Sequence, residues 1–214
     1  CNIPYVACCS LKDVIYTTQH HRTLKIYTKT GDKGRTSLFT GERRSKFDSV
    51  FEALGDVDEL NSNLGLVREY LKESEKKDAL QDVSKMLVKI QCSLLDIGSC
   101  IATPLNSASD KQLQRTEFDE NLVQELEQNI DRYWKELPEL KNFILPSGGK
   151  LSCSLHVSRS VCRRAERKIS SLLHAGEVSK DVAKYVNRLS DLLFTLARYA
   201  AFVEENEEVI YKKQ

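Results

Sequence analysis

Two neighbouring segments near the N-terminus combine glycines, lysines and hydroxyl side chains in an order that follows neither helical nor strand periodicity. They are Thr28-Lys29-Thr30-Gly31-Asp32-Lys33-Gly34-Arg35-Thr36-Ser37 and Gly41-Glu42-Arg43-Arg44-Ser45-Lys46. Glycine lets backbone amides turn toward an anion, and lysine and hydroxyl groups supply further donors, so this composition suits a loop around phosphate oxygens. The order differs from the Gly-x-x-x-x-Gly-Lys-Ser/Thr phosphate loop and from the dinucleotide pattern Gly-x-Gly-x-x-Gly. The segments therefore indicate a polyphosphate ligand, with a basic, solvated hairpin turn as the alternative.

A second group of polar residues recurs at helical spacing further along the chain. Steps of i, i+3, i+7, i+10 and i+11 place five of them on one side of a helix: His156, Arg159, Arg163, Glu166 and Arg167. A second set shares one side of the next helical segment: Asn187, Asp191, Phe194 and Arg198. A solvated face carrying ion pairs is the alternative. Because three arginines outnumber the single glutamate, this arginine face (Arg159, Arg163, Glu166 and Arg167) has cationic groups left for an anion. We interpret His156 as a packing residue with no catalytic role.

The composition is that of an ordinary soluble protein. With 214 residues, of which 41% are hydrophobic and 29% charged, the chain can bury a full core as one domain. Its formal net charge of +1 provides no long-range field for a nucleic acid or an anionic membrane, so an anion site must be local. No apolar run approaches the roughly 20 residues that a membrane-spanning helix needs. We therefore expect neither a nucleic-acid partner nor a membrane.

The seven cysteines form an odd set without Cys-x-x-Cys spacing, which argues against a disulfide framework and a zinc site. We predict reduced thiols. Four of them fall in helical patterns, where a thiol packs as a small apolar group: Cys92, Cys100, Cys153 and Cys162. Residues 1–23 contain one acidic residue, Asp13, and fit a disordered arm or the remnant of a transit peptide. Because the chain begins at Cys1, we expect the native N-terminus to lie upstream.

Apolar residues beyond residue 46 recur at three- and four-residue steps and predict five helices. The stripes run through residues 50–71, 80–101, 118–137, 151–172 and 182–203. Pro138 is expected to end the third helix and Gly176 to cap the fourth. Extended structure is expected only at Leu24, Ile26 and the segment near Leu38-Phe39, so no sheet of consequence is predicted. The predicted fold is all-α, a single domain of residues 24–214 formed by a five-helix up-and-down bundle with an extended N-terminal phosphate-binding loop.

Six short motifs together resemble the PduO-type ATP:cob(I)alamin adenosyltransferases. They are Thr28-Lys29-Thr30-Gly31-Asp32-Lys33-Gly34, Thr40-Gly41-Glu42-Arg43-Arg44, Asp58-Glu59-Leu60, Leu145-Pro146-Ser147-Gly148-Gly149, Arg163-Arg164-Ala165-Glu166-Arg167 and Asn187-Arg188-Leu189-Ser190-Asp191. The resemblance runs from about residue 25 to residue 212. In detail it is most similar to the animal mitochondrial members, those linked to methylmalonic aciduria of the cblB type. It therefore implies a location in the mitochondrial matrix.

The resemblance also implies a homotrimer whose active sites lie between neighbouring subunits. On one subunit the ATP-binding residues would be Thr28, Lys29, Thr30, Gly31, Thr36, Ser37 and Lys46. On the next subunit they would be Arg163, Arg164, Ala165, Glu166, Arg167, Asn187 and Asp191. The residues with a catalytic role would be Arg163, Phe143, Asp58 and Arg159, and no protein side chain is assigned as a metal ligand. Arg159 is implied to pair with Asp58 across the interface, and Phe143 to lie under the corrin ring.

The implied reaction requires no protein nucleophile. Cob(I)alamin attacks the 5′ carbon of ATP, expels triphosphate and forms adenosylcobalamin, so the protein aligns the carbon with cobalt and stabilises the leaving group. The implied cofactors are ATP, Mg²⁺ and cobalamin, taken up as cob(II)alamin or cob(I)alamin. The implied partners are a reductase and methylmalonyl-CoA mutase, which would receive the product. Phe143 would displace the axial ligand of cob(II)alamin and so make cobalt easier to reduce, although the residues alone also allow its ring to fill the bundle core.

Two other classes of function remain open at the level of sequence. A helical bundle could be a non-catalytic scaffold whose arginine face binds an acidic partner helix, although a scaffold has no need of Thr28 to Ser37. An ATP-dependent kinase or ligase is the second alternative, but neither a Walker-type lysine nor a metal-binding acidic motif is evident. A kinase releases ADP whereas an adenosyltransferase releases triphosphate, so the cleavage products of ATP separate these classes.

Overall fold

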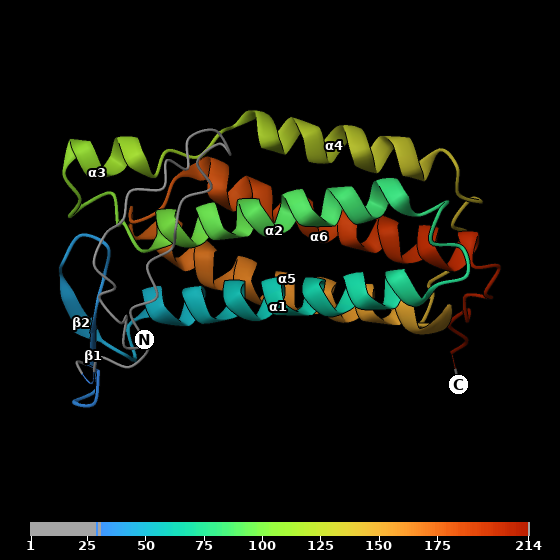
Figure 1. Ribbon diagram of the computed structural model, residues 1–214, viewed down its shortest axis with the longest axis horizontal. Helices are drawn as coiled ribbons and strands as arrows, with labels where there is room; N and C mark the ends of the chain where they lie inside the picture. Colours follow the sequence, from blue (N-terminus) through green and yellow to red (C-terminus); the bar gives the residue numbers. More distant parts are fainter. Residues whose placement is uncertain (1–28, 30, 214) are drawn as a thin grey trace, which may run out of the picture.

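The computed structural model describes residue 29 and residues 31–213, and this part of the chain is mostly helical. The predictions for Leu24, Ile26, Thr28, Thr30 and residues 1–23 lie outside the described residues. The elements are β1 (Arg35–Ser37), β2 (Arg43–Ser45), α1 (Ser49–Glu73), α2 (Gln81–Ile101), α3 (Asp110–Arg115), α4 (Asn121–Trp134), α5 (Gly149–His174) and α6 (Lys180–Val203). The long helices run side by side along the molecule, and the two strands lie at one end (Figure 1).

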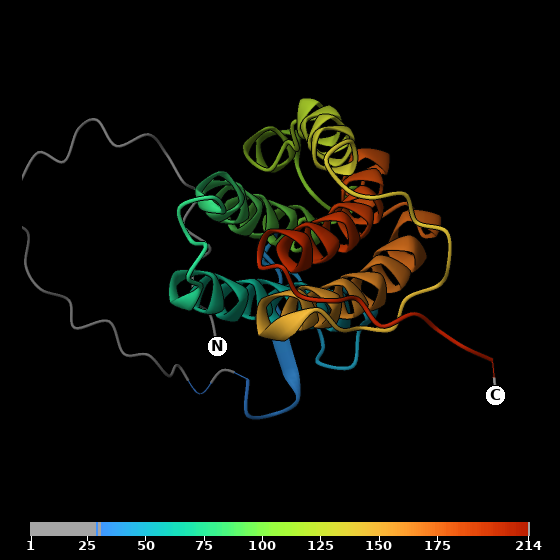
Figure 2. The same cartoon turned by 90° about the vertical axis from the view of Figure 1, so that its right-hand side faces the viewer.

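The helices pack as a bundle around one apolar core. α5 packs against both α1 and α6, α1 packs against α2, and α4 covers the other side of α6, an arrangement seen end-on in Figure 2. The predicted stripes supply this core, which includes the fully buried Leu60, Leu64, Leu87, Leu155 and Leu189. Removing such side chains from water is the main term that stabilises a bundle, at about 25 cal/mol per Å² of apolar surface. The predicted all-α bundle is confirmed.

Local capping interactions determine where the helices next to the strands begin and end. The Asp48 side chain accepts a hydrogen bond from the Val50 N–H at 3.0 Å and so begins α1 directly after β2. Gly176 has a φ of 71° and follows the last turn of α5, where the Glu177 N–H donates to the Leu172 carbonyl at 2.9 Å. The predicted glycine cap is therefore confirmed, and it turns Glu177 toward the strands.

The third predicted helix is shorter than its apolar pattern. It spans Asn121–Trp134 as α4, so it ends before Pro138 is reached. The Glu136 and Leu137 N–H groups donate to carbonyls only three residues back, because the residue before a proline is pushed out of the α region. At the other end Phe118 lies outside the helix, and its ring packs edge-on against Tyr185 with centroids 5.3 Å apart.

A sixth, short helix was not predicted. α3 has only six residues, too few to show an apolar period, and none of them is buried. The available signal was the pair Ser109 and Gln112, because the Gln112 side chain accepts from the Ser109 N–H at 3.0 Å as in a capping box. The extended segment predicted near Leu38-Phe39 is present as β1, which ends one residue before Leu38 and, among the described residues, pairs only with β2.

The cysteines that the structure describes lie in helices, as predicted. Cys162 is buried and donates to the Val186 carbonyl at 3.3 Å, whereas Cys92, Cys100 and Cys153 are half-buried. Burial, and then the charge of Asp96, raises the pKa of the Cys100 thiol to about 12, so it is protonated near neutral pH. Within the described residues, no helix is long and apolar enough to cross a bilayer.

Candidate functional site

The glycine- and lysine-rich segments fold as a β-hairpin at one end of the bundle (Figure 1). β1 and β2 pair antiparallel, with Thr36 opposite Arg44. Gly34 and Gly41 have φ values of 72° and 87°, in the left-handed region that favours glycine, so the turns on either side of β1 depend on these two residues. The hairpin reading of this sequence was therefore right about the local geometry, and that geometry leaves the hairpin accessible to a ligand.

Lys46 folds back over the start of the hairpin. A Cβ atom added at Gly31 would lie 3.2 Å from the Lys46 Nζ atom, and the Lys46 N–H donates to the Gly34 carbonyl at 2.9 Å. Two residues predicted to bind ATP therefore lie together. Thr36 and Ser37 are half-buried on β1, and Lys29, with a φ of 58°, is exposed before the first turn. An ammonium group above an open glycine backbone is an arrangement that can contact phosphate oxygens.

Arg44 fixes the hairpin to the rest of the bundle. Its Nε donates to Glu42 at 2.8 Å, and its Nη1 donates to Glu177, on the loop between α5 and α6, at 2.9 Å. The side chain is only 14% exposed, and its hydrogen bonds, first to Glu42 and then to Glu177, raise its pKa above the usual value. The Phe39 N–H adds a bond to the Ala102 carbonyl at 2.9 Å. The hairpin is thus oriented relative to the ends of α2 and α5.

The arginine face presents two exposed guanidinium groups in the second half of α5. Among the described residues the Arg163 side chain has no hydrogen bond or ion pair, while Arg167 Nη1 donates to the Arg163 carbonyl at 3.1 Å. Glu166 is engaged with α6, where Asn187 Nδ2 donates to it at 2.8 Å. The carboxylate of the exposed Asp191, one turn later on α6, accepts a long bond of 3.4 Å from Arg188. This surface can bind an anion through forked donors.

Two predicted ATP-binding positions on α5 face the neighbouring helices. Arg164 Nε donates to Asp56 at 3.0 Å and its Nη2 donates to Glu59, so Arg164 joins α5 to α1. Ala165 is fully buried in the core. Lys168 pairs with Glu52 one turn further along. These contacts orient α5 against α1, and contact of Arg164 or Ala165 with ATP stays a prediction.

His156 and Arg159 flank the Phe194 ring where α5 meets α6. The His156 and Phe194 ring centroids are 6.0 Å apart, and the Arg159 Cζ atom is 5.7 Å from the Phe194 centroid. His156 is 4% exposed, and within the described chain its Nδ1 and the Arg159 Nε are buried without a hydrogen-bond partner. Burial, and then the charge of Arg159, lowers the pKa of His156 to about 4. The expected packing role is confirmed, but its ring nitrogen is left unsatisfied.

We expect His156 to make the folded state less stable in mild acid. Its pKa falls from 6.5 to about 4 on folding, so the unfolded chain binds more protons; stability is full above pH 6.5 and is lost as the pH falls toward 4. The urea midpoint of the wild type should therefore drop more between about pH 7 and about pH 4.5 than that of His156→Gln. His174→Gln, at the exposed end of α5, is the control and should follow the wild type. Equal declines for wild type and His156→Gln would contradict this.

Phe143 lies at the opposite end of the bundle from the hairpin, on the loop that precedes α5. Its side chain is 84% exposed, so it does not fill the core. The C-terminal segment runs beside it, and the Phe143 carbonyl accepts from the Tyr211 N–H at 2.8 Å. Asp58 is exposed on α1, and no ion pair joins it to Arg159 within the described chain. A single chain thus brings Gly31 and Lys46 together and separates them from Phe143.

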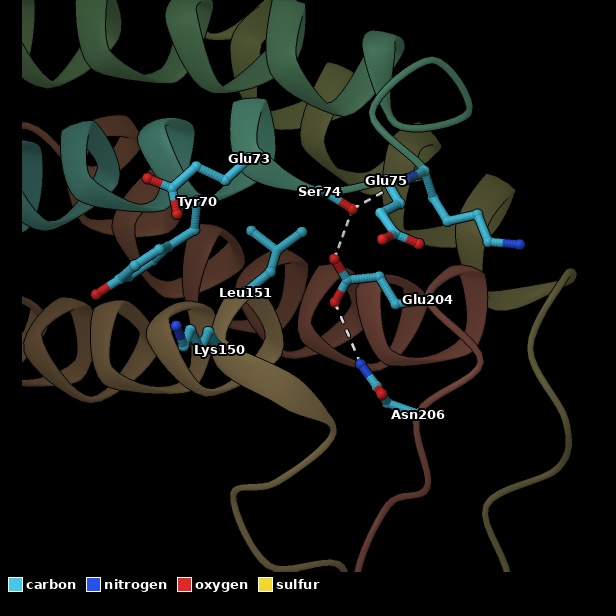
Figure 3. Close-up of a pocket in the computed structure, with 9 residues that line it drawn as sticks. Tyr70, Glu73, Ser74, Glu75, Lys150, Leu151, Glu204 and Asn206 are labelled. Carbon is cyan, nitrogen blue, oxygen red and sulfur yellow. Dashed lines mark hydrogen bonds between the residues drawn. The ribbon is translucent and has the colours of Figure 1, made fainter.

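Two cavities open at the ends of helices, and neither is lined by Lys46, Arg163 or Phe143. The first, of about 350 Å³, lies where the end of α1 meets the start of α5 and the end of α6; Figure 3 shows Glu73, Lys150 and Glu204 around it. Ser74 Oγ donates to Glu204 at 2.6 Å on its edge. The second, of about 400 Å³, lies beside α3 and is lined by Cys100 and other residues. Over residues 31–213 and at Lys29, no cluster of three or more His, Cys, Asp or Glu side chains is placed to hold a metal ion.

The sequence did not predict the roles of two arginines: Arg44, which holds the hairpin, was missed, and Arg198, near the end of α6, was misplaced. Arg44 had a signal, because residues 42 and 44 point to the same side of an extended segment and have opposite charges. Nothing in the sequence indicates that Glu177 would lie beside them. Arg198 was placed on the polar face of its helix, but it is 3% exposed, because Trp134 and Glu208 cover it.

Comparisons with known proteins agree with the resemblance. Residues 26–200 match the family described as cobalamin adenosyltransferase. The chain is 56% identical over 189 residues to corrinoid adenosyltransferase MMAB of Mus musculus, which covers 88% of this chain and 78% of that protein. It is 42% identical over 175 residues to the corrinoid adenosyltransferase of Bacillus subtilis, which covers 82% of this chain and 86% of that protein.

Among solved structures the chain is similar to a Phe-to-Ala variant of the PduO-type ATP:corrinoid adenosyltransferase from Lactobacillus reuteri complexed with cobalamin and ATP. That similarity has a TM-score of 0.80 at 37% identity and covers 88% of this chain and 100% of the other. The chain belongs to the cobalamin adenosyltransferase family.

Proposed function

We propose that this protein transfers the 5′-deoxyadenosyl group of ATP to cob(I)alamin, forming adenosylcobalamin and releasing triphosphate. The observation that carries the proposal is the family match over residues 26–200. The geometry supports it, because the exposed Arg163 and Arg167 and the hairpin with Lys46 are cationic surfaces suited to a triphosphate. Residues 24–214 then form one adenosyltransferase domain, and residues 1–23 an arm or the remnant of a transit peptide.

The protein's part in this reaction is positioning and electrostatics. Cob(I)alamin is the nucleophile: its cobalt lone pair forms the bond to the 5′ carbon of ATP, and the bond from that carbon to the triphosphate oxygen breaks. Arg163 and Lys46 stabilise the negative charge that moves onto the leaving triphosphate. The Glu166–Asn187 hydrogen bond holds the polar face of α5 and α6 in one arrangement around the nucleotide.

Mg²⁺ is proposed to accompany ATP. This ion keeps several waters and is usually bound by one or two protein groups together with the phosphates of its nucleotide. The described residues are compatible with this mode of binding, since they contain no cluster of three or more carboxylate, His or Cys side chains placed to hold a metal ion. Its charge would help to neutralise the triphosphate.

The active site is proposed to form between subunits of a homotrimer. α5 has 26 residues, so its two ends, one near the hairpin and the other near Phe143, are about 39 Å apart. One chain therefore cannot place both the hairpin and Phe143 beside the same reacting carbon atom. The buried Arg159 Nε without a partner and the exposed Asp58 support an ion pair completed by a neighbouring copy.

We expect Arg159→Ala and Asp58→Ala each to weaken the trimer and the activity, because either change leaves the other charge unpaired in the interface. Sedimentation velocity over a dilution series measures the assembly. The double swap Asp58→Arg with Arg159→Asp is the matched control, since it restores the pair in reversed order and should recover part of the trimer. An unchanged trimer in both single variants, with normal activity, would remove this role.

The cellular location and the protein partners are proposals that rest on the resemblance of the sequence motifs to the animal mitochondrial members. We place the protein in the mitochondrial matrix, where a reductase would supply cobalamin in the reduced state and methylmalonyl-CoA mutase would receive adenosylcobalamin. The 56% identity to the corrinoid adenosyltransferase of Mus musculus supports an animal-type member of the family.

The cleavage products of ATP test the proposed function against its alternatives. The protein is incubated anaerobically with MgATP and chemically reduced cobalamin, and phosphorus NMR identifies the products. Triphosphate should appear in an amount equal to the ATP consumed, and no ATP should be consumed when cobalamin is omitted. Release of ADP would indicate a kinase or ligase, and no consumption of ATP would indicate a scaffold; either result contradicts the proposal.

A further inference from the structure

The loop that carries Phe143 is held mainly by hydrogen bonds from the end of the chain. We call residues 138–148 the aromatic loop and residues 204–211 the C-terminal segment. The Tyr211 N–H donates to the Phe143 carbonyl at 2.8 Å, and the Leu145 N–H donates to the Val209 carbonyl at 2.8 Å. The Val209 N–H donates to Ser147 Oγ, also at 2.8 Å. With Ile144 opposite Ile210, these bonds form a short antiparallel bridge.

Apolar packing contributes little to this bridge. Phe143 is 84% exposed, and in the C-terminal segment Val209, Ile210 and Tyr211 are each about half exposed. Hydrogen bonds between exposed strands are weak on their own, because water competes for the same groups. The bridge therefore needs an attachment to the bundle to hold one position.

Arg198 provides that attachment. Its guanidinium is buried on α6, with the side chain only 2% exposed, and it contacts both segments. Its Nε lies 3.3 and 3.2 Å from the two carboxylate oxygens of Glu208, in the C-terminal segment. Its Nη2 donates at 3.0 Å to the carbonyl of Pro138, where the aromatic loop begins. The Trp134 ring lies under the same group, with its centroid 5.2 Å from Cζ.

The other end of the aromatic loop is fitted against the end of α6. A Cβ atom at Gly148 would lie 2.5 Å from the Ala201 Cβ, and one at Gly149 would lie 2.5 Å from Asn206 Nδ2. Both glycines have positive φ values, 87° and 91°, so larger residues are disfavoured there by conformation as well as by space. The loop is thus fixed at Pro138 and at Gly148, and the C-terminal segment crosses between these points.

We infer that Arg198 is a positioning residue for Phe143. By binding both Glu208 and the Pro138 carbonyl, Arg198 fixes the C-terminal segment against the aromatic loop and so determines the position of the Phe143 ring relative to the bundle. The inference rests on the proposed function and on the position under the corrin that the family resemblance implies for the Phe143 ring. A loosened loop would impair displacement of the axial ligand, and hence reduction of cob(II)alamin. ATP binding would be spared, because in the described chain neither the hairpin nor Arg163 forms a hydrogen bond with either segment.

The test removes the link at Glu208, which is less buried than Arg198. Glu208→Ala is compared with Glu207→Ala, its exposed neighbour, and with Arg198→Lys, which keeps the charge but cannot reach both partners. Without cobalamin, hydrogen exchange at the Leu145, Val209 and Tyr211 amides should be about tenfold faster or more in Glu208→Ala and unchanged in Glu207→Ala. This measurement needs no activity.

The kinetic arm starts from cob(II)alamin with a mild reductant. The Glu208→Ala rate should fall about tenfold while the KM for ATP and the rate with cob(I)alamin stay near those of Glu207→Ala. Electron paramagnetic resonance should show a weaker four-coordinate signal. Unchanged exchange at the three amides overturns the inference, as does faster exchange with a normal cob(II)alamin rate. A wild-type protein that forms no adenosylcobalamin overturns the proposed function instead, whatever the exchange shows.

Discussion

Arg163→Ala is expected to lower kcat/KM for ATP by about a hundredfold or more, since removing one charged donor from a developing anion typically costs a factor of 10² to 10³. The side chain is exposed on α5 and has no hydrogen bond or ion pair among the described residues. Its loss therefore leaves no buried charge, and alanine favours the helix, so the circular dichroism spectrum and thermal midpoint should stay close to those of the wild type.

Steady-state kinetics with cob(I)alamin held in excess measure this effect. Lys85→Ala is the matched control, because it removes an exposed cation from α2, far from the arginine face, and should leave kcat/KM unchanged. A normal kcat/KM in Arg163→Ala would show that the arginine face does not bind the nucleotide. A loss of helical content together with activity would instead assign Arg163 to folding.

Phe143→Ala is expected to produce a selective defect. Because the ring is 84% exposed, its removal should change the free energy of unfolding by no more than about 0.5 kcal/mol. A ring that filled the core would cost about 3 to 5 kcal/mol instead. ATP affinity should be unchanged, since the hairpin lies at the other end of the bundle. With cob(II)alamin and a mild reductant the rate should collapse, because the cobalt keeps its axial ligand and stays hard to reduce.

The control for Phe143→Ala is the same protein supplied with cobalamin already reduced to the cob(I) state, where much less activity should be lost. Leu95→Ala, which removes a partly exposed apolar side chain from α2, should behave like the wild type in both assays. Electron paramagnetic resonance of the MgATP complex distinguishes four-coordinate from five-coordinate cob(II)alamin. A four-coordinate signal at wild-type intensity in Phe143→Ala would contradict the assignment.

The long helices were predictable because burial of one face requires apolar residues at three- and four-residue steps along the sequence. α2 follows the four- and three-residue alternation of Leu80 to Ile101 to within one residue. Helix ends depend on other physics: α4 stops at Trp134 because of Pro138 and its turns, and α3 is too short to have a stripe. Prediction therefore fails where a single capping group or a proline, and not a repeated period, decides the structure.

The candidate site was predictable only in part, for a related reason. Spacing along α5 places Arg163, Glu166 and Arg167 on one face, and the structure adds the bond from Glu166 to Asn187. Links between distant segments leave no periodic trace. The pairs of Arg44 with Glu177 and of Arg198 with Glu208 could not be inferred from spacing, because they depend on how loops fold back onto helix ends.

The proposed reaction transfers the 5′-deoxyadenosyl group from ATP to cobalt through its 5′ carbon. ATP labelled with carbon-13 at the 5′ position should be incubated anaerobically with the protein, Mg²⁺ and cob(I)alamin, and the products followed by carbon NMR and visible absorption. The account predicts that the label appears in a cobalt-bound methylene group, in step with a light-sensitive adenosylcobalamin spectrum and an equal amount of triphosphate. Label that remains in ATP, ADP or AMP while cobalamin is unchanged would contradict the account.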